Sequence, residues 1–466
     1  MRAHEAGALH GQAGHRGPSW LEAPLDVNAL VTPLWSRTVD RDAVGRLEAG
    51  GVPVTELARE FGTPIYVLDE QDFRERARAF HDAFDGVDVY YAGKAFLCAA
   101  VVRWTHEEGL RLDVCTSGEL AVALRAGMPT EHIGFHGNNK STAELCRAVE
   151  VGVGRLIVDS FDEIDRLVEL TAELGTRAHV MVRVTAGVEA HTHEYIATAH
   201  EDQKFGFSIA EGDAFDAVRR VLDAPGLELL GLHSHVGSQV FDTSGFEVAA
   251  RRVLALRARV RDELGEVLPE LGLGGGFGIA YTTKDTPSSP AELAGGLLGI
   301  VAHECKAMGI DVPRLSVEPG RAIAGPAMHT LYEVGTVKRV PLDGGASRTY
   351  VAVDGGMSDN LRTALYDADY SCTLASRRSD ATPVLARVVG KHCESGDILV
   401  KDEFLPGDIR PGDLLAVPGT GAYCRSLASN YNHVPRPGVV AVRDGAARLV
   451  VRPETEDDLL RLDVGS

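Results

Sequence analysis

The sequence contains no apolar run long enough to cross a bilayer and no closely spaced pair of cysteines. No window approaches the roughly 18 apolar residues that a transmembrane helix requires. The seven cysteines are odd in number and scattered, without the C-x-x-C spacing of zinc or redox sites. These absences predict a soluble cytoplasmic protein whose cysteines are mostly reduced and buried.

Basic residues are also outnumbered. The chain has 47 Lys and Arg against 67 Asp and Glu, a formal net charge of −20. A surface of that sign repels nucleic acid and anionic lipid, so neither is expected as a partner. Apolar residues make up 44% of the 466 residues and charged residues 24%, the balance of a folded globular protein. The length is that of two domains, or of one large barrel with a smaller partner.

Eight short apolar runs recur along the first two thirds of the chain. Between them lie helical patterns, such as 142–151 and 162–174, with Ser, Thr or Asp near their starts. This alternation describes βα units, and eight of them predict an α/β fold with a closed parallel (β/α)8 TIM-like barrel. An open doubly wound sheet shares the alternation, but the number of runs favours the barrel. The runs cover 87–93, 110–115, 133–137, 155–160, 178–185, 228–235, 268–276 and 314–320.

The sequence pattern changes beyond about residue 325, where short apolar runs are separated by Gly, Pro and Asp. Examples are 385–389 and 414–417, and the pattern is typical of a β-rich domain. We therefore expect four segments: a loosely structured extension over 1–36, a segment contributing to the β domain over 37–62, the barrel over 63–328, and a C-terminal β-rich domain over 329–466.

Almost every predicted barrel strand ends in a residue capable of chemistry. Barrels of this class place their active site at the C-terminal ends of the strands, so these side chains should converge on one mouth. In chain order they are Lys94, Asp113, His136, Asp159, Arg183, His233 with His235, Gly274 to Gly276, and Glu318.

Two of these strand ends favour a cofactor that carries a phosphate. Lys94 would face the mouth, where partial desolvation makes a neutral amine available for a Schiff base, although a solvated loop lysine would look the same in sequence. The run Gly274-Gly275-Gly276 follows the seventh strand, the usual phosphate site of such barrels. Bare glycines let backbone N–H groups approach phosphate oxygens closely.

The histidines raise a competing chemistry. Two histidines at i and i+2 point the same way from a strand and can bind a metal ion, which would make the protein a metal-dependent barrel hydrolase. A histidine packed in the barrel interior is the third possibility, above all for His233. The candidate ligands are His233 with His235, His191 with His193, and the strand-end carboxylates Asp113 and Asp159.

The last strand end carries Glu318-Pro319-Gly320-Arg321. A carboxylate at this mouth can hold a pyridine nitrogen protonated and so tune how strongly the ring withdraws electrons. The planar guanidinium of Arg321 suits a carboxylate or a phosphate. A surface ion pair is disfavoured by the rigid Pro-Gly between the two charges.

The order of the lysine, the H-x-H-x-G-S-Q run, the G-G-G-F loop and the E-P-G-R run resembles the alanine-racemase-like, fold type III class of pyridoxal-phosphate enzymes, over residues 50 to 435. Within that class the chain resembles the diaminopimelate decarboxylase family. The narrower resemblance rests on FHGNNKS (135–141), EAHTHE (189–194), KFGF (204–207), VDGGM (353–357) and HCESGD (392–397). The chain departs from the family's common pattern at Leu361, Thr363 and Thr116, none of which removes a functional group.

The resemblance implies pyridoxal 5'-phosphate as cofactor and assigns roles to residues. Lys94 would carry the cofactor, His235 would stack on its ring, and Glu318 would contact the pyridinium. A homodimer would share its active sites, because Cys393, which would return a proton, and Glu394 would come from the neighbouring subunit. The phosphate would be held by Gly237, Ser238, Gly274, Gly275, Gly276 and Tyr423, and the substrate by Arg321, Arg362, Tyr366, Tyr423 and Glu394.

The activity that the resemblance implies is decarboxylation of meso-2,6-diaminopimelate to L-lysine and carbon dioxide, the last step of lysine biosynthesis. A decarboxylase of ornithine, lysine or arginine on the same fold is the nearest alternative. A racemase fits less well, because racemases that resemble this fold place an arginine where this chain has Glu318. A catalytically silent regulatory homologue is a further alternative.

Overall fold

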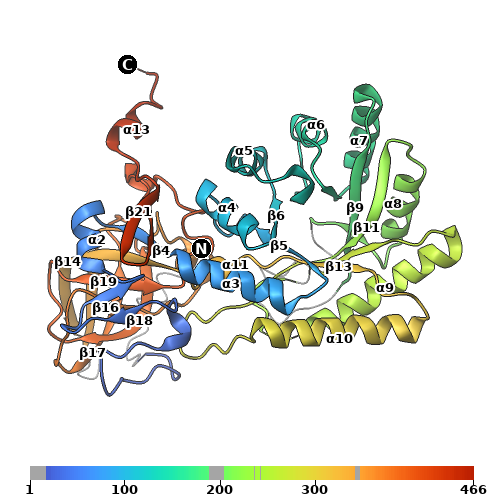
Figure 1. Cartoon of the computed structure of the whole chain (residues 1–466). Coiled ribbons are helices and arrows are strands. Elements are labelled where there is room, and N and C mark those ends of the chain that lie inside the picture. The colour runs from blue at the N-terminus through green and yellow to red at the C-terminus, as the bar shows by residue number, and fades with distance from the viewer. Residues whose placement is uncertain (1–16, 188–203, 236, 242, 342–346, 466) are drawn as a thin grey trace, which may run out of the picture. The chain divides into compact units, whose positions relative to one another are not determined.

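The structure is a computed structural model that describes residues 17–187, 204–235, 237–241, 243–341 and 347–465. The chain divides into two compact units (Figure 1). The barrel unit comprises Arg74–Gly278 and Pro287–Ile323, and the β unit comprises Met1–Phe73, Ile279–Thr286 and Ala324–Ser466. Within the described ranges, every helix is too short or too polar to span a bilayer.

Eight parallel strands close into a barrel, since each strand pairs with its neighbour and the last pairs with the first. Their sequence ranges match the eight apolar runs, so the predicted fold class is confirmed. The strands are β5 (Asp88–Ala92), β6 (Arg111–Val114), β7 (Ile133–Phe135), β8 (Arg155–Val158), β9 (Ala178–Thr185), β11 (Leu227–His233), β12 (Glu270–Gly272) and β13 (Arg314–Val317), with β10 (Phe207–Ser208) added beside β9.

Helices connect the barrel strands and are defined by their caps. Ser141 and Glu144 form a capping box at the start of α6, and Ser160 accepts from the backbone N–H of Glu163 at the start of α7. Such caps satisfy the free N–H groups of a first turn and fix where each helix begins after its strand. The helices are α3 (Glu70–Ala83), α4 (Ala99–Glu107), α5 (Ser117–Ala126), η2 (Thr130–His132), α6 (Thr142–Val151), α7 (Phe161–Leu174), α8 (Asp213–Leu222), α9 (Ser244–Leu264), α10 (Pro290–Met308) and α11 (Arg321–Ala324).

The β unit is built on a second, mixed sheet with strand order β18-β17-β15-β14-β4-β20-β21; β19 pairs with β14, and β16 pairs with β19. A small sheet of β1, β2 and β3 accompanies it. The strands are β1 (Asp40–Arg41), β2 (Leu47–Ala49), β3 (Val52–Pro53), β4 (Ile65–Asp69), β14 (Met328–Pro341), β15 (Ser347–Val353), β16 (Thr373–Leu374), β17 (Pro383–Val389), β18 (Ile398–Pro406), β19 (Leu414–Pro418), β20 (Val439–Arg443) and β21 (Ala446–Val451); the helices are η1 (Thr32–Leu34), α2 (Val54–Phe61), α12 (Arg362–Tyr366), η5 (Tyr431–His433) and α13 (Glu456–Leu460).

The boundary between the units differs from the one expected at residue 63. Strand β4 pairs with β14 and β20 in the sheet of the β unit rather than opening the barrel. All five of its residues are buried. An apolar run of that length has the same sequence pattern in a barrel and in the centre of a mixed sheet, so periodicity did not reveal its partners.

The described part of the N-terminal extension is ordered, in contrast to the loose segment expected over 1–36. Leu34 and Trp35 are buried in the same apolar cluster as Leu331 and Val440. The side chain of Asn28 donates to the carbonyl of Ser379 and accepts from its N–H. The low apolar content of this stretch concealed these few anchoring contacts.

Candidate active site

A cavity of about 330 Å³ lies in the barrel unit and is lined by residues from the C-terminal ends of its strands. Three residues predicted to carry the chemistry, Lys94, His235 and Glu318, line it together. Lys94 follows β5 as an exposed side chain, although the sequence argument expected it to be partly desolvated. The cavity's other lining residues are Ala92, Gly93, Asp113, Cys115, His136, Gly137, Asn138, Asn139, Lys140, Arg183, Phe205 and His233.

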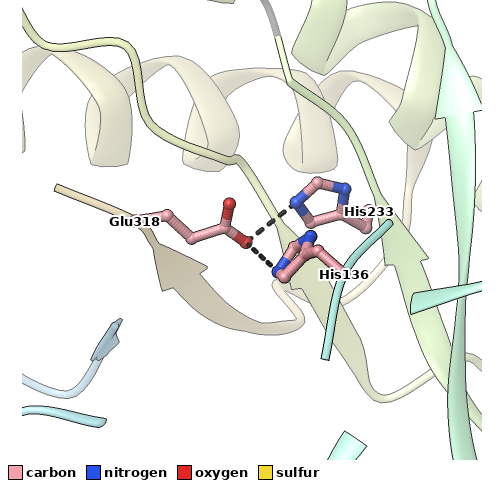
Figure 2. A group of neighbouring side chains, drawn as sticks. All are labelled: His136, His233 and Glu318. Atoms are coloured by element: carbon pink, nitrogen blue, oxygen red, sulfur yellow. Dashed lines mark hydrogen bonds and ion pairs between the residues drawn. The ribbon is translucent and has the colours of Figure 1, made fainter. Parts of the chain in front are cut away.

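Glu318 stands just beyond β13 and faces two histidines from other strands (Figure 2). Nε2 of His233, at the end of β11, lies 2.8 Å from Oε1 of Glu318. Nε2 of His136, just after β7, lies 3.6 Å from the same oxygen. At 2.8 Å the protonated Nε2 of His233 donates to the carboxylate, which fixes the carboxylate's orientation.

A second carboxylate shares this neighbourhood. Oδ1 of Asp113, on β6, lies 3.2 Å from Nε2 of His136 and 3.9 Å from Nη2 of Arg155. Burial, reinforced by the charge of Glu318, raises the pKa of Asp113 well above its usual value. Burial alone would also raise the pKa of Glu318, but His233, His136 and Arg155 oppose it and lower that pKa well below its usual value. Of the two acids, Glu318 is therefore the ionised one at neutral pH.

The histidines around the cavity are neutral at pH 7. Burial lowers the pKa of His136 to about 3 and lowers that of His233 despite the adjacent carboxylate. Burial, helped by the charge of Lys94, lowers the pKa of His235 well below its usual value. A neutral imidazole presents one N–H and one lone pair, so these rings can orient neighbouring groups without competing for charge.

The Gly274–Gly276 loop after β12 runs so close to its neighbours that side chains are excluded. A Cβ on Gly275 would lie 2.2 Å from the carbonyl oxygen of Glu318, and one on Gly276 would lie 2.2 Å from that of Gly237. The N–H of Gly275 donates to Nδ1 of His235 at 3.1 Å. This contact places the predicted ring-stacking histidine directly against the predicted phosphate loop.

Arg321 and Ser238, both predicted site residues, contact each other. Nη2 of Arg321 donates to Oγ of Ser238 at 2.7 Å, and Arg321 is buried. The interpretation of Glu318 and Arg321 as a surface pair is therefore wrong, because both side chains are buried at the end of β13. Gly237, next to Ser238, is buried as well.

Two buried cations, Lys140 and Arg183, line the wall of the cavity. The sequence predicted no role for Lys140, and it indicated Arg183 only as one of the strand-end residues. Nζ of Lys140 lies 2.8 Å from Oε1 of Glu163, and Nη1 of Arg183 lies 3.5 Å from Oδ2 of Asp159. Asp159 also accepts from the N–H of Gly206, so it serves as a structural anchor of the wall. Lys140 belongs to the FHGNNKS run, whose conspicuous polar content was the available signal.

Five predicted site residues belong to the β unit and are described there. Arg362 on α12 is buried, and its Nη1 donates to the hydroxyl of Tyr370 at 2.7 Å. Its guanidinium carbon lies 4.7 Å from the ring centre of Tyr281. Cys393 is an exposed free thiol between β17 and β18. The others are Tyr366 at the end of α12, Glu394 beside Cys393, and Tyr423 after β19, whose φ of 73° is left-handed.

The turn that presents Cys393 and Glu394 is anchored by Asp397. One carboxylate oxygen accepts from the N–H of Met357 at 2.6 Å and the other from that of His392 at 2.8 Å. Gly396 N–H donates to the side chain of Glu394 at 3.1 Å. Asp397 lies in the HCESGD run, and its anchoring role was not evident from sequence.

The metal-ligand set suggested by the sequence is not the set that the structure brings together. His235 bonds to the glycine loop, and the pair His191 and His193 lies outside the described residues. His136, His233 and Glu318 do offer one ligand atom each within 4.8 Å of one another (Figure 2). However, Nη2 of Arg155 lies 3.6 Å from the shared Glu318 oxygen, and a dication there would face a permanent buried guanidinium charge.

Comparison with known proteins decides between the remaining possibilities. The family described as "Pyridoxal-dependent decarboxylase, pyridoxal binding domain" matches residues 70–325. Diaminopimelate decarboxylase of Mycobacterium bovis is 59% identical, over 93% of this chain and 98% of that protein. The chain belongs to the diaminopimelate decarboxylase family.

Other members of the family support this assignment. Diaminopimelate decarboxylase of Bacillus subtilis is 47% identical, over 90% of this chain and 95% of that protein. The crystal structure of the enzyme from M. jannaschii has a TM-score of 0.86 at 30% identity, covering 92% of this chain and 98% of that one. The structure from Helicobacter pylori complexed with L-lysine has a TM-score of 0.79 at 29% identity, covering 88% and 98%.

Proposed function

We propose that the protein decarboxylates meso-2,6-diaminopimelate to L-lysine and carbon dioxide, with pyridoxal 5'-phosphate as cofactor, as the last step of lysine biosynthesis. The observation that carries the proposal is the buried carboxylate of Glu318, which His233 hydrogen-bonds at the mouth of a barrel whose family is pyridoxal-dependent. Lys94 and His235 line the same cavity.

The residues around the cavity fit this cofactor. Gly275 and Gly276 pass too close to the carbonyl oxygens of Glu318 and Gly237 to carry side chains, and in loops without side chains backbone N–H groups can approach a phosphate. Together with Gly237, Ser238, Gly274 and Tyr423, they would hold the phosphate group. Lys94 would hold the aldehyde carbon, and His235 would lie against the ring.

When bound, the cofactor supplies an electron sink for the pair released as carbon dioxide leaves. The chain's own part is to orient and to hold protons. Oε1 of Glu318 accepts from Nε2 of His233, which fixes the direction of the carboxylate. An ionised carboxylate here would keep a facing ring nitrogen protonated. Glu318→Gln should therefore retain the cofactor and lose several orders of magnitude in turnover, whereas near wild-type turnover would contradict this role.

The substrate has an amino acid at each end, so the site must recognise the unreacted end by its charges. We assign the substrate's carboxylates to the guanidinium groups of Arg321 and Arg362, with the hydroxyls of Tyr366 and Tyr423 beside them. Glu394 would bind the distal ammonium. Basic amino acids such as ornithine lack the distal carboxylate and should be poorer substrates.

Cys393 and Glu394 are assigned to the neighbouring subunit's site in a homodimer. Cys393 presents an exposed thiol on an anchored turn and would return the proton to the substrate carbon. Cys393→Ala should lower kcat more than it raises KM. Glu394→Ala should instead raise KM about tenfold or more, the effect of losing a charge-assisted hydrogen bond. The opposite pattern would exchange the two assignments.

Shared sites can be tested by mixing two inactive variants. Lys94→Ala lacks the barrel contribution and Cys393→Ala lacks that of the β unit, so one of the two sites in a hybrid dimer would be intact. We expect activity to return on mixing. Failure to recover activity despite demonstrated subunit exchange would argue against shared sites.

The proposed activity is tested by carbon dioxide release from purified protein. meso-Diaminopimelate, L-lysine, L-ornithine and L-arginine are supplied separately, with and without pyridoxal phosphate, and metal content is measured in parallel. We expect release from diaminopimelate alone, dependent on the cofactor and unaffected by chelators. Faster release from a basic amino acid would favour that decarboxylase, and chelator-sensitive hydrolysis would favour the metal-dependent alternative.

A further inference from the structure

Arg155 is a buried charge that neither the fold nor the proposed site has yet explained. It opens β8, all four of whose residues are buried, and is 1% exposed. Its guanidinium carbon lies 3.7 Å from the ring centre of Tyr90 on β5, and Nη1 donates to Oγ of Ser316 on β13 at 2.9 Å. Burying a guanidinium is expensive unless other groups compensate its charge.

The compensating charge comes from the two acids at the mouth. Nη2 of Arg155 lies 3.6 Å from Oε1 of Glu318 and 3.9 Å from Oδ1 of Asp113. Among the described residues, Nη2 and Nε have no hydrogen-bond partner. Arg155 therefore acts on both acids through its charge rather than through a bidentate pair. Because Asp113 is protonated, the charge of Arg155 is balanced by the carboxylate of Glu318.

We propose that Arg155 is a positioning residue that keeps Glu318 ionised toward the cofactor's ring by holding a permanent positive charge beneath it. This rests on the proposed function in so far as Glu318 is taken to face the cofactor. Ser316 fixes the guanidinium from the strand that also leads into Glu318. The ring of Tyr90, on the neighbouring strand β5, packs against the guanidinium.

The other groups near Glu318 do not replace this charge. His233 and His136 also lower the pKa of Glu318, but burial lowers the pKa of both rings and of His235. At pH 7 the three rings are neutral, whereas Arg155 keeps its full charge. Asp113 repels a second negative charge, and its own pKa is raised by burial and by Glu318. Without Arg155, Glu318 would keep the hydrogen bond from His233 but lose the permanent cation 3.6 Å away. Its pKa should therefore rise, and it should take up a proton more readily. The titratable and charged groups that line this region are Lys94, Asp113, Cys115, His136, Lys140, Arg155, Arg183, His233, His235 and Glu318.

The experiment follows the protonation of Glu318 directly in the protein freed of cofactor. Infrared spectra of protein with isotope-labelled glutamate are recorded between pH 5 and 9, and Glu318→Gln identifies the signal of Glu318. In the wild type we expect no protonated Glu318 in this range. In Arg155→Met we expect a protonated carboxyl that persists above pH 6 and disappears in the double variant with Glu318→Gln.

Arg155→Lys keeps the positive charge that Arg155→Met removes, so comparing the two variants separates the effect of charge from that of side-chain shape. If the charge matters, Arg155→Lys keeps Glu318 ionised as in the wild type, whereas a merely structural role predicts that both variants fail alike. In the loaded enzyme, Arg155→Met should lower kcat by about the same factor as Glu318→Gln, leave KM little changed, and add little when the two are combined. A wild-type titration in Arg155→Met would overturn the proposal.

A second comparison covers the case in which Arg155→Met does not fold. The buried acid that loses its cation in that variant is Glu318, so the double variant Arg155→Met, Glu318→Gln should fold. If the double variant is equally unfolded, the proposal is overturned. Because the titration uses neither substrate nor turnover, it can succeed or fail independently of the decarboxylation assay.

Discussion

Replacing Gly275 by alanine should weaken cofactor binding, because the loop after β12 has no room for a side chain. An added Cβ would lie 2.2 Å from the carbonyl oxygen of Glu318, whereas ordinary contacts begin at 3.4 Å, so the two segments must separate by about 1.2 Å. Such overpacking typically costs about 1–3 kcal/mol. At about 1.4 kcal/mol per decade, cofactor affinity should fall by roughly one to two decades if the bound state carries that strain.

The assay is an absorbance titration of the cofactor-free protein with pyridoxal phosphate, accompanied by thermal unfolding. Gly295→Ala is a matched control, because Gly295 lies within α10 and an added Cβ meets no atom within 4 Å. That variant should bind normally, and its unfolding free energy should rise by up to about 1 kcal/mol. Wild-type affinity and stability in Gly275→Ala would refute the close-approach argument.

Two further predictions concern stability. Lys140→Met removes the cation 2.8 Å from the buried Glu163 and should lower the free energy of unfolding in urea by about 3–5 kcal/mol. The control Arg219→Ala breaks an exposed pair with Asp216 and should change it by less than about 1 kcal/mol. Equal effects of the two substitutions would contradict the stabilising role of the buried pair. Burial raises the pKa of Glu403 to about 7 from 4.5, so the folded state binds more protons between these values and loses stability as pH rises through them. Glu403→Gln should thus add about 3 kcal/mol at pH 8 and almost nothing at pH 4, and an equal change at both pH values would refute the shift.

The barrel was predictable from sequence because its strands are short, apolar and evenly interrupted by capped helices. Residues 65–69 were included in the barrel range 63–328, although β4 belongs to the sheet of the β unit, since the sequence pattern of a fully buried five-residue strand does not indicate its neighbours. The order in residues 17–36 was also missed. It depends on single contacts such as that between Asn28 and Ser379, which join residues far apart in the chain.

The convergence of the candidate site residues on one cavity was predictable to the extent that they lie at strand ends. Lys94, His235 and Glu318 follow apolar runs, and barrel geometry alone makes such positions converge. Arg155 was not predictable, because it begins its strand and in sequence resembles an ordinary solvated flanking charge. Its role depends on Asp113 and Glu318, which reach it only through the closure of the barrel.

The central claim is that the barrel mouth holds the cofactor on Lys94, and borohydride trapping tests it most directly. The loaded protein is reduced and digested, and the peptides are identified by mass spectrometry. The account predicts a cofactor-derived mass on the peptide that contains Lys94, absent from Lys94→Ala. Attachment to another lysine, above all to Lys140 in the wall of the same cavity, would contradict it.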